Sequence, residues 1–104
     1  MGWVTRAPMP TARSYLAVEV VGSTLYAVGG WTGSSWLTVN EAYDPSTDTW
    51  ASRASMPTAR ANLAAGVVGS ILYAVGGLNA LGQRTAVNQA YDPSTDTWAS
   101  RASM

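Results

Sequence analysis

An internal repeat constrains the fold of this chain more than any other feature. The fourteen residues YDPSTDTWASRASM occur at 43–56 and again at 91–104, and a partial third copy, WVTRAPM, occupies 3–9. Most of the remaining residues also align, with offsets of 47 and 48, so the chain consists of two consecutive, similar units. Repeats of this length are typical of propellers and other arrays in which each unit packs on its neighbours.

Each unit is predicted to contain four short strands. The first two, SYLAVEVV and TLYAVGG in the first unit, are apolar and are joined by Gly-Ser, a tight-turn signal. The third and fourth, VNEAYD and TWASRA, flank DPSTD, where Pro45 favours a turn and Asp44 caps its backbone. No stretch has helical periodicity, so the prediction is all-β and antiparallel. The predicted strands are residues 14–21, 24–30, 39–44, 49–54, 61–68, 71–77, 87–92 and 97–102.

A Gly-Gly pair ends the second predicted strand of each unit, and a Tyr and a Trp follow at fixed spacing in the third and fourth. This pattern resembles the kelch repeat, and the resemblance covers nearly the whole chain. It implies that each unit is one blade of a β-propeller, with blade 1 at about 10–56, blade 2 at about 57–104 and 3–9 a surplus fourth-strand segment. The aromatic rings are expected to pack between sheets. The signature residues are Gly29, Gly30, Tyr43, Trp50, Gly76, Gly77, Tyr91 and Trp98.

Two blades are too few for a closed propeller, which has about four to eight. A blade packs on a neighbour with each of its faces, so two blades leave two faces uncovered. Either the chain is a fragment of a longer array, or identical chains complete the ring through head-to-tail contacts. The near identity of the units favours self-assembly, with a homotrimer of six blades, the commonest kelch number, preferred over a homotetramer of eight. It also favours an engineered, consensus-like or duplicated sequence.

The composition argues against several classes of function. Six basic and six acidic residues give a net charge of zero, so no nucleic-acid or membrane partner is expected. The chain has no His and no Cys, and no metal or other cofactor is expected. Some kelch-like propellers are oxidases or sugar-processing enzymes, but the copper oxidases among them use His, Tyr and Cys at the metal. We therefore expect a non-catalytic scaffold or protein-interaction module, with a glycan-binding propeller or a fragment of a larger kelch enzyme as alternatives.

Targeting segments are also absent from the sequence as printed. No apolar run reaches the roughly eighteen residues of a membrane span. The first residues, MGWVTRAPMP, lack the apolar stretch of a secretory signal. If the chain is expressed as printed, we expect it in the cytoplasm.

Strand polarity places the connectors between blades and the loops 31–38 and 78–86 at one end of the ring. In kelch proteins these loops often form a partner-binding face, so this end is the candidate surface for a peptide or protein. Arg13, Arg60 and Arg84 belong to it, and exposed guanidinium groups would grip carboxylates or phosphates. In the alternative, favoured by their recurrence in every unit, Arg13 and Arg60 hold their own connectors by bonding to loop carbonyls or to a neighbouring blade.

Trp31 and Trp36 occur in only one of the two units, in the loop that differs most between them. Exposed indole rings anchor peptides or stack on sugars. In the alternative, which carries equal weight, the two rings fold over the adjacent connector.

Both ends of the chain carry a fourth-strand segment, although a closed seam between blades has room for one. We expect the C-terminal copy, 98–104, to form the strand, because its own DPSTDT turn pairs it within its blade at low closure cost. Residues 3–7 would then be displaced, lie along the edge of a neighbouring chain, or exchange with the other copy.

Overall fold

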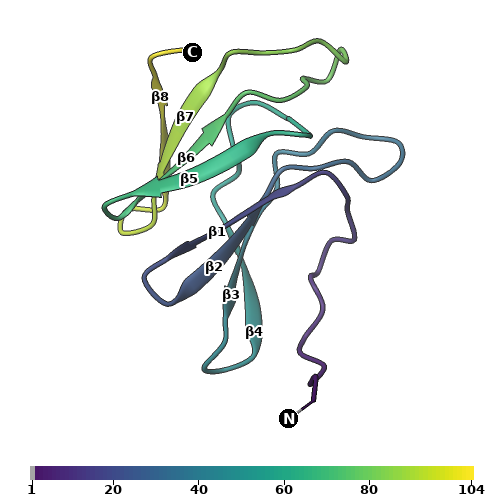
Figure 1. Cartoon of the computed structure of the whole chain (residues 1–104), viewed down its shortest axis with the longest axis vertical. Coiled ribbons are helices and arrows are strands. Elements are labelled where there is room, and N and C mark those ends of the chain that lie inside the picture. Colours follow the sequence, from purple (N-terminus) through teal and green to yellow (C-terminus); the bar gives the residue numbers. More distant parts are fainter. Residues whose placement is uncertain (1) are drawn as a thin grey trace.

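A computed structural model of the chain describes residues 2–104. Eight strands form two four-stranded antiparallel sheets, and the strands of each sheet follow one another in sequence order (Figure 1). The prediction of an all-β chain with two four-stranded blades is confirmed. Blade 1 contains β1 (Ala17–Val21), β2 (Thr24–Val28), β3 (Asn40–Asp44) and β4 (Thr49–Arg53). Blade 2 contains β5 (Ala64–Val68), β6 (Ile71–Val75), β7 (Asn88–Asp92) and β8 (Thr97–Arg101).

The first strand of each blade begins later than the sequence predicts. The prediction extends these strands over 14–16 and 61–63. Tyr15 and Asn62, however, both have a φ of 56°, in the left-handed region. A left-handed residue interrupts the extended backbone, so regular pairing begins only after it.

The turns between the third and fourth strands are capped by their own first residue, as predicted. The Asp44 carboxylate accepts hydrogen bonds from the Ser46 hydroxyl at 2.7 Å and from the Ser46 backbone N–H at 2.9 Å. These two bonds hold the pKa of Asp44 below its ordinary value. Asp92 and Ser94 repeat the cap in blade 2 at the same distances.

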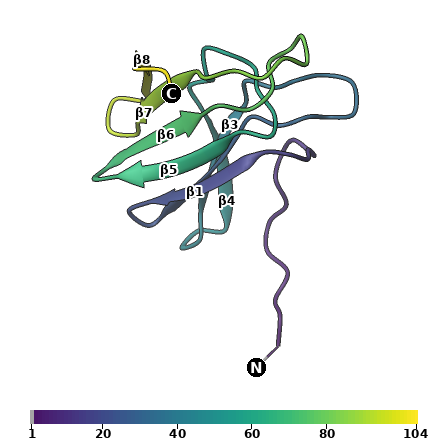
Figure 2. The ribbon, with the colours of Figure 1, turned by 45° about the horizontal axis from the view of Figure 1, so that its top comes forward.

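The two blades pack face to face, with β1 beside β5 (Figure 2), and the hydrophobic core lies between them. We call the face of a blade that is turned toward the next blade in the sequence its forward face, and the opposite one its backward face. Blade 1 contributes its forward face to the core, and blade 2 its backward face. The buried core residues are Ala17, Tyr26, Val28 and Ala42 from blade 1, Met56 and Leu63 from the connector, and Leu72, Ala74 and Tyr91 from blade 2.

The Gly-Gly pairs make close backbone contacts that a side chain would block. Gly29 and Gly30 have φ values of 69° and 114°. A Cβ on Gly29 would lie 2.6 Å from the carbonyl oxygen of Arg60 in the connector to blade 2, and one on Gly30 would lie 2.9 Å from that of Ser14. Gly30 N–H donates to the Arg60 carbonyl at 2.9 Å. The pair therefore lets the connectors on both sides approach the end of β2.

The two terminal copies of the fourth strand take different positions. Residues 97–101 form β8 of blade 2, as expected from their short turn. The N-terminal copy forms no strand and runs past blade 1 on the side away from blade 2 (Figure 1). It is therefore displaced from the fourth-strand position, one of the expected outcomes, and its Arg6 and Ala7 bond to blade 1 of the same chain.

Replacing Gly29 with Ala is expected to lower the free energy of unfolding by about 3 kcal/mol, because it adds a clash with a backbone carbonyl to an unfavourable φ. Gly76 is the matched control, since its φ is 70° but the nearest atom to its Cβ would be the flexible tip of Met104, at 3.0 Å. Gly76→Ala should cost about 1 kcal/mol. Chemical denaturation measures both losses. Equal losses would show that the close contact with the Arg60 carbonyl contributes nothing.

Candidate functional site

Arg13 is a buried anchor within blade 1. Its side chain is 0% exposed, and its guanidinium donates to the carbonyls of Gly29 at 2.6 Å and Ala27 at 3.0 Å. It also pairs with the Glu41 carboxylate at 2.9 Å. Burial lowers the pKa of Arg13, and the Glu41 charge opposes this shift. These bonds hold the N-terminal connector against its own sheet.

Arg60 occupies the same position in blade 2, where it is 0% exposed. Its guanidinium donates to the carbonyls of Gly76 at 3.1 Å and Ala74 at 3.2 Å, and to the Gln89 side-chain oxygen at 2.9 Å. Within residues 2–104 no carboxylate pairs with Arg60, because Gln89 stands where blade 1 has Glu41. Burial lowers the pKa of Arg60.

The geometry of both arginines corresponds to the alternative in which they hold connectors rather than bind a ligand. Arg13 and Arg60 hold connectors through backbone carbonyls, and their guanidinium groups are inaccessible to a ligand in this structure. Arg84, in contrast, is exposed on the loop 78–86. Of the three arginines considered at this end, Arg84 alone therefore has a side chain that a ligand can reach.

Trp31 and Trp36 pack on each other in the loop of blade 1, with ring centroids 4.3 Å apart and planes inclined at 59°. Both residues are half-buried. A shallow hollow beside them is lined by Trp31, Thr32 and Gly33 of the loop and by residues 12–15 of the connector. The structure thus brings Trp31 next to the connector, while Arg84 belongs to the loop of the other blade.

A further arrangement, absent from the predicted sites, recurs in both blades. Arg53, the last residue of β4 in blade 1, donates to the Tyr91 hydroxyl of blade 2 at 3.2 Å. The next residue, Ala54, donates its N–H to Asp96 at 2.8 Å, and its carbonyl accepts the indole N–H of Trp98 at 2.7 Å. The segment of Arg53 and Ala54 is thus bound by three side chains of blade 2, those of Tyr91, Asp96 and Trp98. We call such a set of a Tyr, an Asp and a Trp on one blade an Arg-Ala site.

Blade 1 has the same site, and the N-terminal segment fills it. Arg6 donates to the Tyr43 hydroxyl at 3.0 Å, Ala7 N–H donates to Asp48 at 2.8 Å, and the Ala7 carbonyl accepts the Trp50 indole N–H at 2.9 Å. A sequence signal existed for this site. The pattern Trp-x-[Ser/Thr]-Arg-Ala occurs three times, at 3–7, 50–54 and 98–102.

The electrostatics of the two sites favour a cationic segment. In each, the Tyr hydroxyl donates to the Asp carboxylate at 2.7 Å. The Tyr43 hydroxyl holds the pKa of Asp48 below its ordinary value, and the Ala54 N–H does the same for Asp96. Burial raises the pKa of Tyr91 to about 12, so its hydroxyl remains a donor. An ionised carboxylate therefore faces the arginine at neutral pH.

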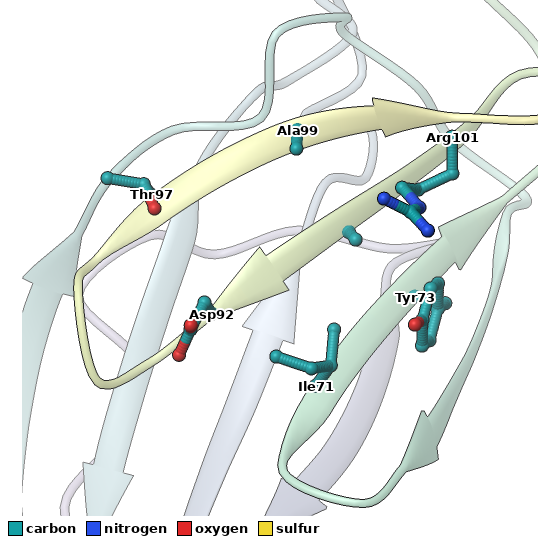
Figure 3. Close-up of a pocket in the computed structure, with 7 residues that line it drawn as sticks. Ile71, Tyr73, Asp92, Thr97, Ala99 and Arg101 are labelled. Carbon is teal, nitrogen blue, oxygen red and sulfur yellow. The ribbon is translucent and has the colours of Figure 1, made fainter.

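The forward face of blade 2 has no blade against it in this chain. Tyr73 and Val75 are partly exposed there, whereas their counterparts Tyr26 and Val28 are 5% and 0% exposed at the contact between the blades. Figure 3 shows the shallow pocket on this face, with its lining side chains on one side of the sheet. The lining residues are Ile71, Tyr73, Ala90, Asp92, Thr97, Ala99 and Arg101.

Residues 2–104 contain no group of three or more His, Cys, Asp or Glu side chains placed to hold a metal ion. Most of their carboxylates are engaged in turns and ion pairs, as Asp44 and Glu41 illustrate. No helix in this part of the chain is long and apolar enough to cross a membrane.

Arg13 contacts Glu41 and Arg60 contacts Gln89, so exchanging the two acceptor types gives a matched pair of substitutions. Glu41→Gln is expected to lower the free energy of unfolding by about 2 kcal/mol, because the Arg13 guanidinium would stay buried without an anion. Gln89→Glu supplies Arg60 with a carboxylate and is expected to raise stability by about 1 kcal/mol. Urea titrations at neutral pH measure both changes. A stability gain in the first variant or a loss in the second would contradict this account.

Comparison with known proteins agrees with the geometry. The Kelch motif matches residues 12–57 and 59–104. Among solved structures, that of YjhT is similar, with a TM-score of 0.90 and 17% sequence identity; the alignment covers 99% of this chain and 42% of YjhT, so the chain spans less than half of that protein's length. At this identity the likeness shows the fold alone. No curated protein sequence matches the chain.

The two matched segments coincide with the two blades. Together they cover nearly the whole chain. Kelch repeats form propeller blades, in agreement with the two sheets and the face-to-face packing described above. The chain therefore belongs to the Kelch motif family.

Proposed function

We propose that the chain is a non-catalytic, self-assembling propeller module, a scaffold that presents protein-binding loops at one end of a ring. One observation carries the proposal. The two faces that the pair of blades leaves open carry most of the side chains of the two faces that are buried between the blades, including the Tyr residues of the core.

The open forward face of blade 2 repeats the buried forward face of blade 1. In the core, Tyr26 packs edge to face against Tyr91, with ring centroids 5.6 Å apart. Tyr73 holds the position of Tyr26 in blade 2, and Tyr43 is the counterpart of Tyr91 in blade 1. A second copy that docked in the same way would set its Tyr43 against Tyr73.

The open backward face of blade 1 supports the same docking. Leu72 and Tyr91 are 0% exposed on the backward face of blade 2, but their counterparts Leu25 and Tyr43 are only half-buried on blade 1. Covering them would remove further apolar surface from water, at about 25 cal/mol for each Å². The contact is head-to-tail, so it closes into a ring when the rotation between copies permits.

Three copies would supply six blades and four copies eight, both within the range of about four to eight seen in propellers. We favour the trimer. The near identity of the two units suits a designed, consensus-like or duplicated sequence in which contacts within and between copies are interchangeable.

The bonding of the polar side chains supports a non-catalytic role. General acid–base catalysis requires groups that are free to exchange protons with a substrate. The chain has no His or Cys, Glu41 is 3% exposed and pairs with Arg13, and Asp44 and Asp92 cap turns.

Native mass spectrometry and analytical ultracentrifugation test the assembly. With 10.9 kDa per chain, a trimer has a mass of about 33 kDa and a tetramer about 44 kDa. We expect the trimer as the main species at micromolar concentration. A folded monomer at every concentration would refute self-assembly.

A substitution on the open face ties the assembly to the proposed contact. Tyr73→Glu should leave the fold intact and abolish assembly, because Tyr73 lines the pocket on the open face of blade 2. Leu81→Glu, at a loop residue that is 79% exposed, is the control for the added charge and should assemble normally.

The loops at the connector end form the proposed surface for a protein ligand, and the hollow beside Trp31 gives the glycan alternative a specific place. Stacking of a sugar on Trp31 would change the tryptophan emission. We expect an unchanged spectrum across a panel of saccharides, because the rings of Trp31 and Trp36 cover each other. A change that Trp31→Ala removes would establish glycan binding instead.

A further inference from the structure

The chain contains two Arg-Ala sites but three segments with the sequence that fills them. Residues 53 and 54 fill the site of blade 2, and residues 6 and 7 fill that of blade 1. The third segment, Arg101 and Ala102, is exposed on the last strand of blade 2, and no site among residues 2–104 receives it.

Arg6 and Ala7 reproduce the contacts of Arg53 and Ala54 closely. The distance from the Arg Nε to the Tyr hydroxyl is 3.0 Å in blade 1 and 3.2 Å in blade 2, and that from the Ala N–H nitrogen to the Asp carboxylate is 2.8 Å in both. The N-terminal segment thus takes, on blade 1, the place that the fourth strand of a preceding blade would take.

The unplaced segment is already held in the conformation that the site accepts. The Asn40 side chain donates to the Ala54 carbonyl at 3.2 Å, and Asn88 donates to the Ala102 carbonyl at the same distance. Ala54 makes this bond while it also accepts the indole N–H of Trp98 in the next blade. The Ala102 carbonyl is thus held by the same bond that the Ala54 carbonyl keeps while it accepts an indole.

We infer that the N-terminal segment, Arg6 and Ala7, is a built-in competitor of assembly: it occupies the site of Tyr43, Asp48 and Trp50 that receives Arg101 and Ala102 of a second copy. The inference rests on the proposed self-assembly and deepens it. It names one contact between two copies and the segment that must leave the site before this contact can form.

The two occupants are held very differently. Trp3 is 104% exposed and Val4 75%, and neither belongs to a sheet, so the N-terminal segment has little beyond Arg6 and Ala7 to hold it. Arg101, in contrast, is part of β8 and would arrive together with the whole forward face of blade 2. The second copy therefore displaces the segment at sufficient concentration, and the segment raises the concentration that assembly requires.

Charge reversal in the full chain tests the competition. Arg6→Glu sets a carboxylate beside Asp48 and should release the N-terminal segment. The protein concentration at which half of the chains are assembled, measured by sedimentation, should then fall about fivefold or more. Arg101→Glu should raise that concentration at least as strongly, because it disables the incoming segment. Arg84→Glu, an equal charge change on an exposed loop, should leave it unchanged.

A peptide titration tests the same site without depending on assembly. The probe is a synthetic peptide of residues 97–104, acetylated and amidated, added to full chains that carry Tyr73→Glu so that they stay apart. Binding is followed by the NMR signal of the Trp50 indole N–H. The chain with Arg6→Glu should bind about fivefold more tightly than the chain with Arg6, and a peptide with Ala in place of Arg101 should not bind.

The outcomes separate this inference from the proposed function. If Arg6→Glu weakens assembly as Arg101→Glu does, the N-terminal segment is part of the seam and the inference is overturned. Equal peptide binding with and without Arg6 also overturns it. If no chain assembles but the peptide binds more tightly to the Arg6→Glu chain, self-assembly fails and the competition for the site stands.

Discussion

The need to cover both faces of each sheet governs this structure. A four-stranded antiparallel sheet with apolar residues on both faces is stable only when another layer packs on each side. Within the chain that requirement is met once, where the forward face of blade 1 meets the backward face of blade 2 and buries Tyr26 and Tyr91. Residues of the same kind remain half-exposed at Leu25, Tyr43 and Tyr73. In the proposed assembly, this difference in burial between equivalent positions is what would drive association.

Arg60 links the blades because its backbone and its side chain face different sheets. Its carbonyl accepts the Gly30 N–H of blade 1, and its guanidinium donates to carbonyls of Ala74 and Gly76 in blade 2. Gly29 allows this approach, since a Cβ there would meet the same carbonyl at 2.6 Å. An arginine recurs in each connector, and in both blades its terminal guanidinium nitrogens donate to backbone carbonyls of the sheet.

The repeat and its turn chemistry made most of the fold predictable from sequence. Gly-Ser, Asp44 and Pro45 act locally, so the strands they join could be located from the sequence alone. The interruption at Tyr15 could not, because Tyr rarely adopts a left-handed conformation; Asn62, at the equivalent position, is of a type that is enriched there. The burial of Arg60 could not be predicted either. A charged side chain is expected to be exposed, and the sequence does not show how many carbonyls surround the guanidinium group. The Arg-Ala sites join residues about forty positions apart, so only the threefold pattern hinted at them.

Near identity of the units gives the chain interchangeable contacts, and this has a cost in specificity. The site of Tyr43, Asp48 and Trp50 binds Arg6 and Ala7 of its own chain, and in the proposed assembly it would bind the matching segment of another chain, because the three Arg-Ala segments share their sequence. Residues that differ between the units lie in the loops 31–38 and 78–86, at the connector end of the sheets, and at strand positions such as Glu19, which corresponds to Gly66. Specificity between partners requires that some contacts be worse in the wrong pairing. In the proposed ring, most side chains of the open faces match those of the buried faces, so the rotation between blades rather than side-chain identity would decide how many copies close it.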